Sequence, residues 1–148
     1  MSIEEENKDL MTRYFTETNA VKGDVAKILA IFDKYFAPNV VYHLTIGDWN
    51  FEQTKQFTAA SYKNVPDLNQ TIEDIVAEGD KVVVRFTISG THNGEFMGIA
   101  PTGKKFTQTS TSIFRIAGGK IAEVWWLADT LGLLQQLGAL QPTEEIGK

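Results

Sequence analysis

The chain has 148 residues, of which 43% are hydrophobic, and a formal net charge of −5. This length and composition fit one domain with a packed core. It contains no cysteine, which excludes disulfides and thiolate metal sites. Its two histidines, His43 and His92, match no zinc spacing, and the negative charge argues against a nucleic-acid partner. With neither a signal-like apolar start nor a stretch of about 18 apolar residues, we expect a cytoplasmic protein without membrane partners.

The first half of the chain has apolar residues at the 3.6-residue spacing typical of amphipathic helices. This spacing predicts helices over residues 3–18, 24–36 and 51–63. A short strand over 40–44 and a loop over 45–50, which carries Trp49, separate the second helix from the third.

From residue 69 onward the apolar residues alternate with a period of two, which indicates strands. The predicted strands cover 69–77, 81–91 and 105–116, and the segment 120–138 starts as a strand and ends as a helix. Helices followed by an antiparallel meander predict an α+β fold, with helices on one face of a curved antiparallel sheet. No repeat or internal linker divides the chain, so we expect a single domain over 1–148, with loose tails at 1–6 and 141–148.

Asp129 stands where the last strand becomes the last helix. Side chains alternate along a strand, so Trp125, Leu127 and Asp129 are expected to share one face. A carboxylate beyond two large apolar groups suits a lined pocket with a single acid. Aspartate is also a preferred helix N-cap, and Asp129 immediately precedes the helix. Both roles are compatible with the sequence.

The run Thr107 to Ser112 can form a strand but has no apolar face. It fits three situations: a sheet surface with threonine and serine bonding across strands, a hydrated subunit interface, or the polar wall of a pocket. The sequence does not rank these three.

Two segments carry a family resemblance. Residues 90–106, GTHNGEFMGIAPTGKKF, and residues 112–139, SIFRIAGGKIAEVWWLADTLGLLQQLGA, closely resemble the SnoaL-like polyketide cyclase family, also called ester cyclases, of the NTF2-like superfamily. The resemblance covers roughly residues 21–139. It implies a cone of three helices and a strongly bent sheet around an apolar pocket, often dimeric through the outer sheet face. It also implies that Asp129 is the acid/base of an intramolecular aldol closure that uses neither metal nor cofactor.

Two departures from the family concern polar positions. Family members commonly have His-Trp-Asp where this chain has Val124-Trp125-Trp126, and an aspartate where it has Ser112. A polycyclic aromatic substrate therefore cannot be assumed from the resemblance.

The leading hypothesis is a cofactor-independent cyclase, or a related lyase or isomerase, acting on a small-to-medium apolar carbonyl compound. Asp129 would act as general acid/base, and His43 and His92 would orient or polarise the substrate. The substrate-binding residues would be Trp49, Trp125, Leu127, Tyr14 and Phe57. One alternative is a non-catalytic ligand-binding or interaction module on the same fold. The other is an epoxide hydrolase or dehydratase, which needs a second carboxylate or a His–Asp pair in the pocket.

An open cavity of about 300 Å³ or more, with Asp129 and a histidine converging on it, would favour an enzyme. A cavity filled by tryptophan and phenylalanine side chains would favour the binding module.

Overall fold

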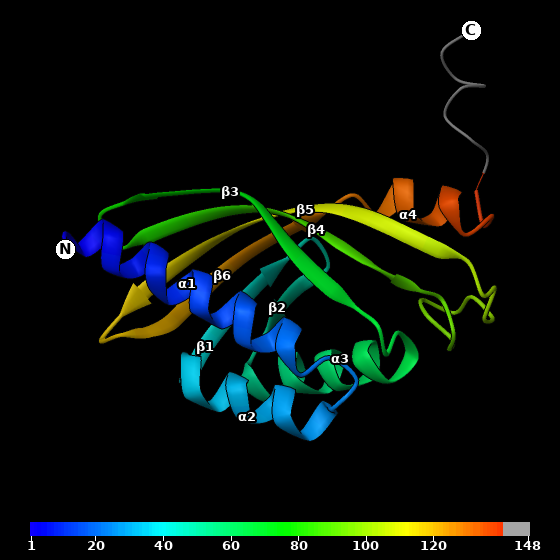
Figure 1. Cartoon of the computed structure of the whole chain (residues 1–148), viewed down its shortest axis with the longest axis horizontal. Helices are drawn as coiled ribbons and strands as arrows, with labels where there is room; N and C mark the ends of the chain where they lie inside the picture. Colours follow the sequence, from blue (N-terminus) through cyan, green and yellow to red (C-terminus); the bar gives the residue numbers. More distant parts are fainter. Residues whose placement is uncertain (141–148) are drawn as a thin grey trace, which may run out of the picture.

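Figure 1 shows a computed structural model of the chain, in which residues 1–140 are described. These residues form four helices and six strands. The helices are α1 (Ile3–Ala20), α2 (Val25–Tyr35), α3 (Phe51–Asn64) and α4 (Thr130–Gln136). The strands are β1 (Phe36–Leu44), β2 (Gly47–Trp49), β3 (Asn69–Glu78), β4 (Lys81–Thr91), β5 (Lys105–Ala117) and β6 (Lys120–Ala128).

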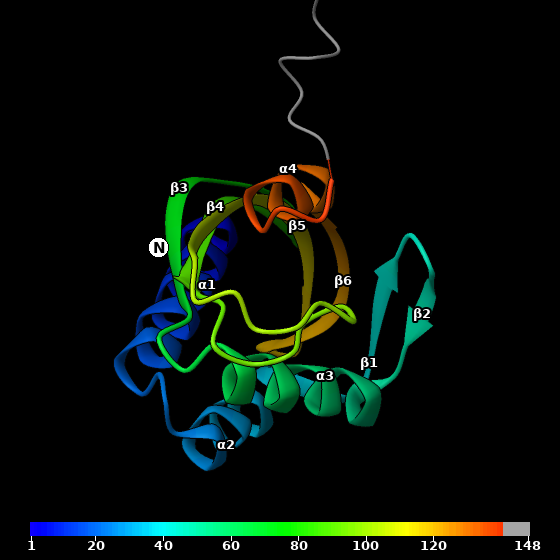
Figure 2. The same cartoon turned by 90° about the vertical axis from the view of Figure 1, so that its right-hand side faces the viewer.

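The strands form one sheet in the order β2-β1-β6-β5-β4-β3. Figure 2 shows how strongly it curves, with α1, α2 and α3 on its inner side and the β1–β2 hairpin at one end. The predicted α+β class and the curved sheet are confirmed. The expectation of a wholly antiparallel sheet is wrong for one pair, because β1 runs parallel to β6. Four strands, β2 to β5, and helix α3 separate these two in sequence.

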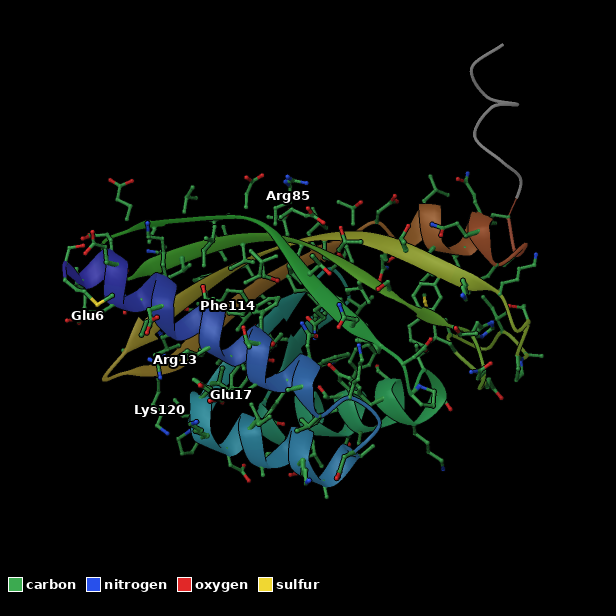
Figure 3. All side chains as sticks on the ribbon, in the orientation of Figure 1. Glu6, Arg13, Glu17, Arg85, Phe114 and Lys120 are labelled. Carbon is green, nitrogen blue, oxygen red and sulfur yellow. The ribbon has the colours of Figure 1, made fainter. Side chains whose placement is uncertain are left out.

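Aromatic packing joins the helices to the sheet. Tyr14 of α1 makes edge-on contacts with Phe32, Tyr35 and Phe36, at centroid distances of 5.4–5.8 Å. Phe114, seen beneath α1 in Figure 3, reaches the same layer from β5. Each such pair adds about 0.5–1.5 kcal/mol beyond its buried area, so the rings fix the helices over the inner face of the sheet.

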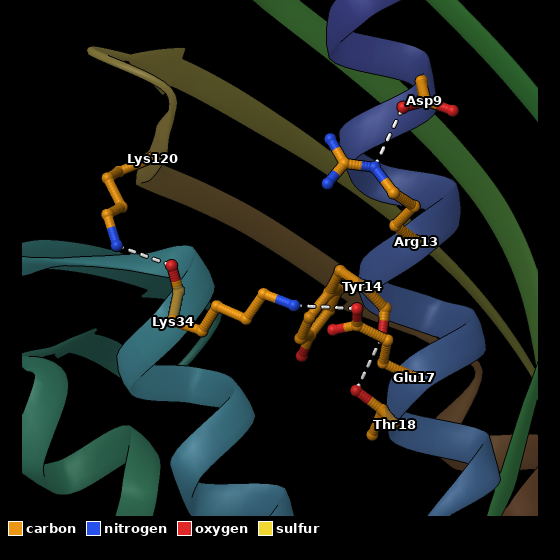
Figure 4. A network of polar contacts seen from close by, with 7 residues as sticks. All are labelled: Asp9, Arg13, Tyr14, Glu17, Thr18, Lys34 and Lys120. Atoms are coloured by element: carbon orange, nitrogen blue, oxygen red, sulfur yellow. Dashed lines mark hydrogen bonds and ion pairs between the residues drawn. The ribbon is translucent and has the colours of Figure 1, made fainter.

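Polar contacts between the elements at the surface are fewer and weaker. Figure 4 shows Lys34 of α2 bonded to Glu17 of α1 at 2.8 Å, and Lys120 of β6 donating to the Lys34 carbonyl. Exposed ion pairs of this kind contribute about 0–1 kcal/mol. The helix positions therefore depend mainly on apolar burial.

Three boundaries differ from the prediction. Residues 3–6 are helical, not loose, because Ser2 and Glu5 form a capping box that starts α1. The predicted loop 45–50 contains the short strand β2, and β1 starts at residue 36 instead of 40. Its pairing with β6 is interrupted between Phe36 and Val41, where Pro38 lacks an N–H to donate.

The predicted tail 141–148 lies outside the described residues. Within residues 1–140, none of the helices has the length and hydropathy needed to cross a bilayer.

Asn19 ties the end of α1 to the edge strand β3. Its side-chain amide donates to the Gln70 carbonyl at 2.6 Å, and its side-chain oxygen accepts from the Gln70 N–H at 2.9 Å. We expect Asn19→Ala to lower the free energy of unfolding by about 2 kcal/mol, because two backbone groups lose their partners. The corresponding fall in Tm is about 5 °C. Asn39→Ala, at an exposed position of β1, is the control and should change Tm by no more than about 1 °C.

Candidate functional site

A cavity of about 120 Å³ lies between the inner face of the sheet and the helices. Aromatic side chains make up much of its wall, neutral polar side chains make up another part, and Val65, Leu68 and Ile88 make up the rest. The aromatic residues are Tyr14, Phe15, Phe32, Tyr42, Trp49, Phe57, Tyr62, Phe86, Phe96, Phe106, Phe114 and Trp126. The neutral polar residues are Thr54, Thr58, Ser61, Gln70, Gln108 and Ser112. No aspartate, glutamate or histidine is among these lining residues.

Strand β6 faces the cavity with the side chains opposite to those predicted. Val124 is buried and Trp126 lines the cavity, whereas Leu127 is 69% exposed. Trp125 stacks on His43 on the outer face, with ring centroids 5.2 Å apart. The prediction that the face of Trp125, Leu127 and Asp129 looks into the pocket is therefore wrong by one residue.

The two faces of the Thr/Ser/Gln run in β5 correspond to two of the three predicted situations, a polar pocket wall and a sheet surface. Gln108, Ser110 and Ser112 are buried on the inner face, and Gln108 and Ser112 line the cavity. Thr107, Thr109 and Thr111 are exposed on the outer face. The run thus supplies a polar cavity wall on one side and a sheet surface on the other.

Two buried polar atoms on this inner face have no hydrogen-bond partner within the described residues. They are Ser110 Oγ and Trp126 Nε1. Trp126 pairs with Ser112 across β5 and β6, and Ser110 is the next residue inward-facing on β5. Buried polar groups normally find a partner, so an unpaired hydroxyl and an unpaired indole N–H beside a cavity indicate capacity for a polar ligand atom.

Tyrosine hydroxyls add a second polar feature to the cavity. Burial, followed by the nearby hydroxyls of Tyr42 and Tyr62, raises the pKa of Tyr14. Burial also raises the pKa of Tyr42 and of Tyr62. Gln70 donates a hydrogen bond to the Tyr62 hydroxyl at 3.2 Å, which leaves the phenolic proton of Tyr62 free to donate. At neutral pH all three groups are uncharged hydrogen-bond donors.

Asp129 occupies the N-cap of α4. Its Oδ1 accepts from the Gly132 N–H at 2.9 Å, and its own backbone N–H donates to the Thr109 carbonyl. The residue is exposed and is absent from the cavity lining. The capping role anticipated for Asp129 is therefore present, and its acid/base role stays a prediction.

Helix α4 also contacts the part of β5 that lies beyond the end of β6. The Gln136 side-chain amide bonds both the N–H and the carbonyl of Thr107, at 2.9 and 2.7 Å. It replaces the contacts that a continuing β6 strand would have made.

His43 lies on the outer face of the sheet, not in the cavity. Its Nδ1 is 2.8 Å from Asp48 Oδ1, and its Nε2 is 2.6 Å from Glu123 Oε2. The epoxide hydrolase or dehydratase alternative requires a His–carboxylate pair inside the pocket. The pair exists here, but on the other side of the sheet.

His92 is fully buried at the start of the segment between β4 and β5. Its Nδ1 accepts from the Thr102 N–H at 3.2 Å and lies 3.0 Å from Thr102 Oγ1. Its Nε2 has no partner within the described residues, and the ring does not line the cavity. The histidine fixes the base of a segment whose Phe96 does reach the cavity.

Three of the eight predicted site residues, Tyr14, Trp49 and Phe57, line the cavity. The leading hypothesis did not include Tyr42, Tyr62, Gln70 and Trp126 among the substrate-binding residues, although they also line the cavity. Gln108 and Ser112 belong to the run for which the wall of a pocket was one of the alternatives. The alternation within residues 107–112 was the available signal, since it places Gln108 and Ser112 on one face. Within residues 1–140, no cluster of three or more histidine, aspartate or glutamate side chains could hold a metal ion.

Known proteins resemble this chain in sequence and in fold. Nogalonic acid methyl ester cyclase of Streptomyces nogalater is 27% identical over 119 residues, which cover 76% of this chain and 87% of that protein. Aklanonic acid methyl ester cyclase DnrD of Streptomyces peucetius is 34% identical over 76 residues, half of this chain. That match spans only about half of the DnrD length, 52%.

In structure, the chain resembles AclR of Streptomyces galilaeus, a suggested hydroxylase, with a TM-score of 0.84 and 28% identity. The superposition covers 97% of this chain and 89% of AclR. A family model, described as SnoaL-like polyketide cyclase, matches residues 13–137. The chain belongs to the SnoaL-like polyketide cyclase family.

Proposed function

We propose that the protein is a cofactor-independent cyclase that closes a ring in an apolar carbonyl compound held in the cavity. The observation that carries the proposal is an aromatic cavity with one uncharged polar wall, formed by Gln108, Ser112 and Trp126 and faced by tyrosine hydroxyls. Aromatic walls suit a planar apolar ligand, and the few polar groups can fix its carbonyl oxygens.

In an aldol closure, an activated methylene loses a proton and its carbon bonds to a carbonyl carbon of the same molecule. The carbonyl oxygen becomes an alkoxide and then takes up a proton, so the product is an isomer of the substrate. Neutral donors such as the Tyr62 hydroxyl can stabilise the developing oxyanion without being desolvated at that moment. Holding a flexible chain folded against the aromatic walls lowers the barrier further.

The proposal assigns no acid or base to the cavity wall. A methylene between two carbonyls is acidic enough to form its enolate with water as the proton acceptor. The wall would then capture the enolate and stabilise the alkoxide. Candidate substrates are the methyl esters named for the relatives, nogalonic acid methyl ester and aklanonic acid methyl ester.

Tyr62→Phe removes a hydroxyl whose proton is free to donate into the cavity. We expect kcat to fall about 100-fold, the size of effect seen when one oxyanion donor is lost. Ring closure would be followed by chromatography, with mass spectrometry showing an unchanged mass. Tyr35→Phe, which alters a buried tyrosine outside the cavity lining, is the control and should keep kcat within about threefold. An unchanged kcat in Tyr62→Phe would remove this hydroxyl from the mechanism.

The acid/base role predicted for Asp129 can be separated from its capping role. Asparagine caps a helix as well as aspartate does, but it cannot exchange the proton. Because the carboxylate lies outside the cavity lining, we expect Asp129→Asn to keep both Tm and kcat, the latter within about threefold. Asp129→Ala should lower the free energy of unfolding by about 1 kcal/mol through loss of the cap. A 100-fold loss of kcat in Asp129→Asn at unchanged Tm would restore the acid/base role.

A non-catalytic ligand-binding module is the second candidate, and a specific observation favours it. The two positions at which the family resemblance implies aspartate, 112 and 126, form one cross-strand pair in the cavity wall, and here they hold serine and tryptophan. The cavity is also smaller than the range of about 300–1,000 Å³ typical of ligand sites. Saturable binding of either methyl ester without any isomeric product would support the module over the cyclase.

We also propose that two copies associate through the outer face of the sheet. Leu127 of β6, Val76 of β3 and Val41 of β1 are exposed there, at 69%, 60% and 36%. We expect sedimentation at micromolar concentration to give a dimer, and Leu127→Lys to shift it toward monomer because a charge would be buried in the interface. A wild-type monomer throughout this range would contradict the dimer.

A further inference from the structure

A connected chain of charged side chains crosses the outer face of the sheet. Asp48 of β2 bonds His43 of β1 at 2.8 Å, and His43 bonds Glu123 of β6 at 2.6 Å. The other oxygen of Glu123 accepts from Arg115 of β5 at 2.9 Å. Four adjacent strands are thereby linked, starting from the edge strand β2.

The geometry requires His43 to carry two ring protons. Ionised carboxylates only accept hydrogen bonds, and each ring nitrogen faces one of them, so both nitrogens must donate. The hydrogen bond that His43 donates to Glu123, and then the one that it donates to Asp48, raise the pKa of His43. The same contact with His43, followed by Arg115, lowers the pKa of Glu123.

The inner face of the same two strands carries part of the cavity wall. His43 pairs with Asp48 across β1 and β2, and the next pair along the strands is Tyr42 with Trp49. Side chains alternate, so the first pair faces outward and the second faces inward. Tyr42 and Trp49 both line the cavity, and the Trp49 ring lies 5.0 Å from that of Phe57.

Strand β2 is a weakly supported part of the wall. It has three residues, it lies at the sheet edge, and its main contacts are with β1 and α3 (Figure 2). A cavity of about 120 Å³ is small for a ligand of several rings, and movement of part of the wall would enlarge it. Short edge elements open locally at low cost, so β2 with Trp49 is a part of the wall that can move.

We propose that protonated His43 holds Trp49 in the cavity wall, and that loss of this proton frees β2 so that the cavity admits larger apolar ligands. His43 is then a positioning residue that acts through Trp49 and sets the ligand size. The inference rests on the cavity being the ligand site, as the proposed function also assumes.

The direction of the pH dependence follows from the raised pKa of His43 and the lowered pKa of Glu123. The contribution of His43 is fully present below its ordinary pKa of about 6.5, and it disappears as the pH rises through the raised value. The contribution of Glu123 disappears only as the pH falls through its lowered value. Within residues 1–140, the charged groups in this chain are Asp48, Glu123 and Arg115, and Trp125 stacks on the His43 ring. The strand is therefore held at mildly acidic pH and freed at alkaline pH.

The first experiment follows the tryptophans by ¹⁹F NMR in protein labelled with 5-fluorotryptophan. The Trp49 signal is assigned by its loss in Trp49→Phe, and the His43 titration is read from its ring-carbon signal. We expect the Trp49 signal to shift with the same midpoint as His43, and to be pH-independent in His43→Gln. Asp48→Ala, which cuts the link to β2 but keeps the histidine, should also abolish the Trp49 shift. The proposal would be overturned if the Trp49 signal did not change during the titration of His43. It would also be overturned if the signal showed the same pH-dependent shift in His43→Gln and Asp48→Ala as in the wild type.

The second experiment measures binding of N-phenyl-1-naphthylamine, a neutral probe with three aromatic rings, by its fluorescence. We expect its dissociation constant to fall at least fivefold as the pH rises through the His43 titration. In His43→Gln, binding should be tight at every pH. Equal pH dependence in wild type and variant, or none in the wild type, would contradict the proposal that His43 sets the ligand size.

Arg85→Gln is the matched control, because Arg85 and Asp74 form an exposed ion pair on the same outer face without touching His43. Its Trp49 signal and its probe binding should match those of the wild type. Neither measurement uses ring closure, so a protein that lacks cyclase activity leaves this inference intact, and the reverse also holds.

Discussion

The cross-strand pair of Ser112 and Trp126 decides the chemical character of the cavity. A strand residue faces either the cavity or the outside, and both of these positions face the cavity. With serine and tryptophan there, the described lining holds no carboxylate or imidazole. Every polar group that a ligand meets is then a neutral donor or acceptor, and burial keeps the tyrosines in that state. A chain of this family can therefore keep the fold and the cavity while the residues at these two positions change the chemistry that the cavity supports.

The fold could be predicted from the sequence because its signals are periodic and local. Helical spacing in the first half and alternation after residue 69 placed the helices and the strands β3 to β6 close to where they lie. The parallel neighbour of β6 could not be predicted in this way, since no local pattern states which distant strand lies alongside. Strand β2 was missed because three residues at an edge give too short a pattern.

The candidate site was harder to predict than the fold, for a reason visible at Asp129. The phase of β6 was set from a residue at the junction with α4, where the alternation ends. A shift of one residue exchanges the two faces of a strand, so Trp125 and Leu127 were assigned inward while Trp126 was left out. The inward face of β6 is better assigned from buried residues within the strand, such as Val124. Ile121 is also buried, but a β-bulge between it and Val124 interrupts the strict alternation of side chains.

The parallel pairing of β1 with β6 has a consequence for how the chain reaches its native state. Phe36 pairs with Ile121 and His43 with Trp125, so β1 finds its partners about 80 residues further along the chain. A two-stranded hairpin alone is marginal in water. Helices α1 and α2 and the meander of β3, β4 and β5 can form from contacts close in sequence, but β1 and β2 must wait for β6. The wall that carries Trp49 therefore cannot form before β6 has been made, and until then the aromatic interior stays open to water.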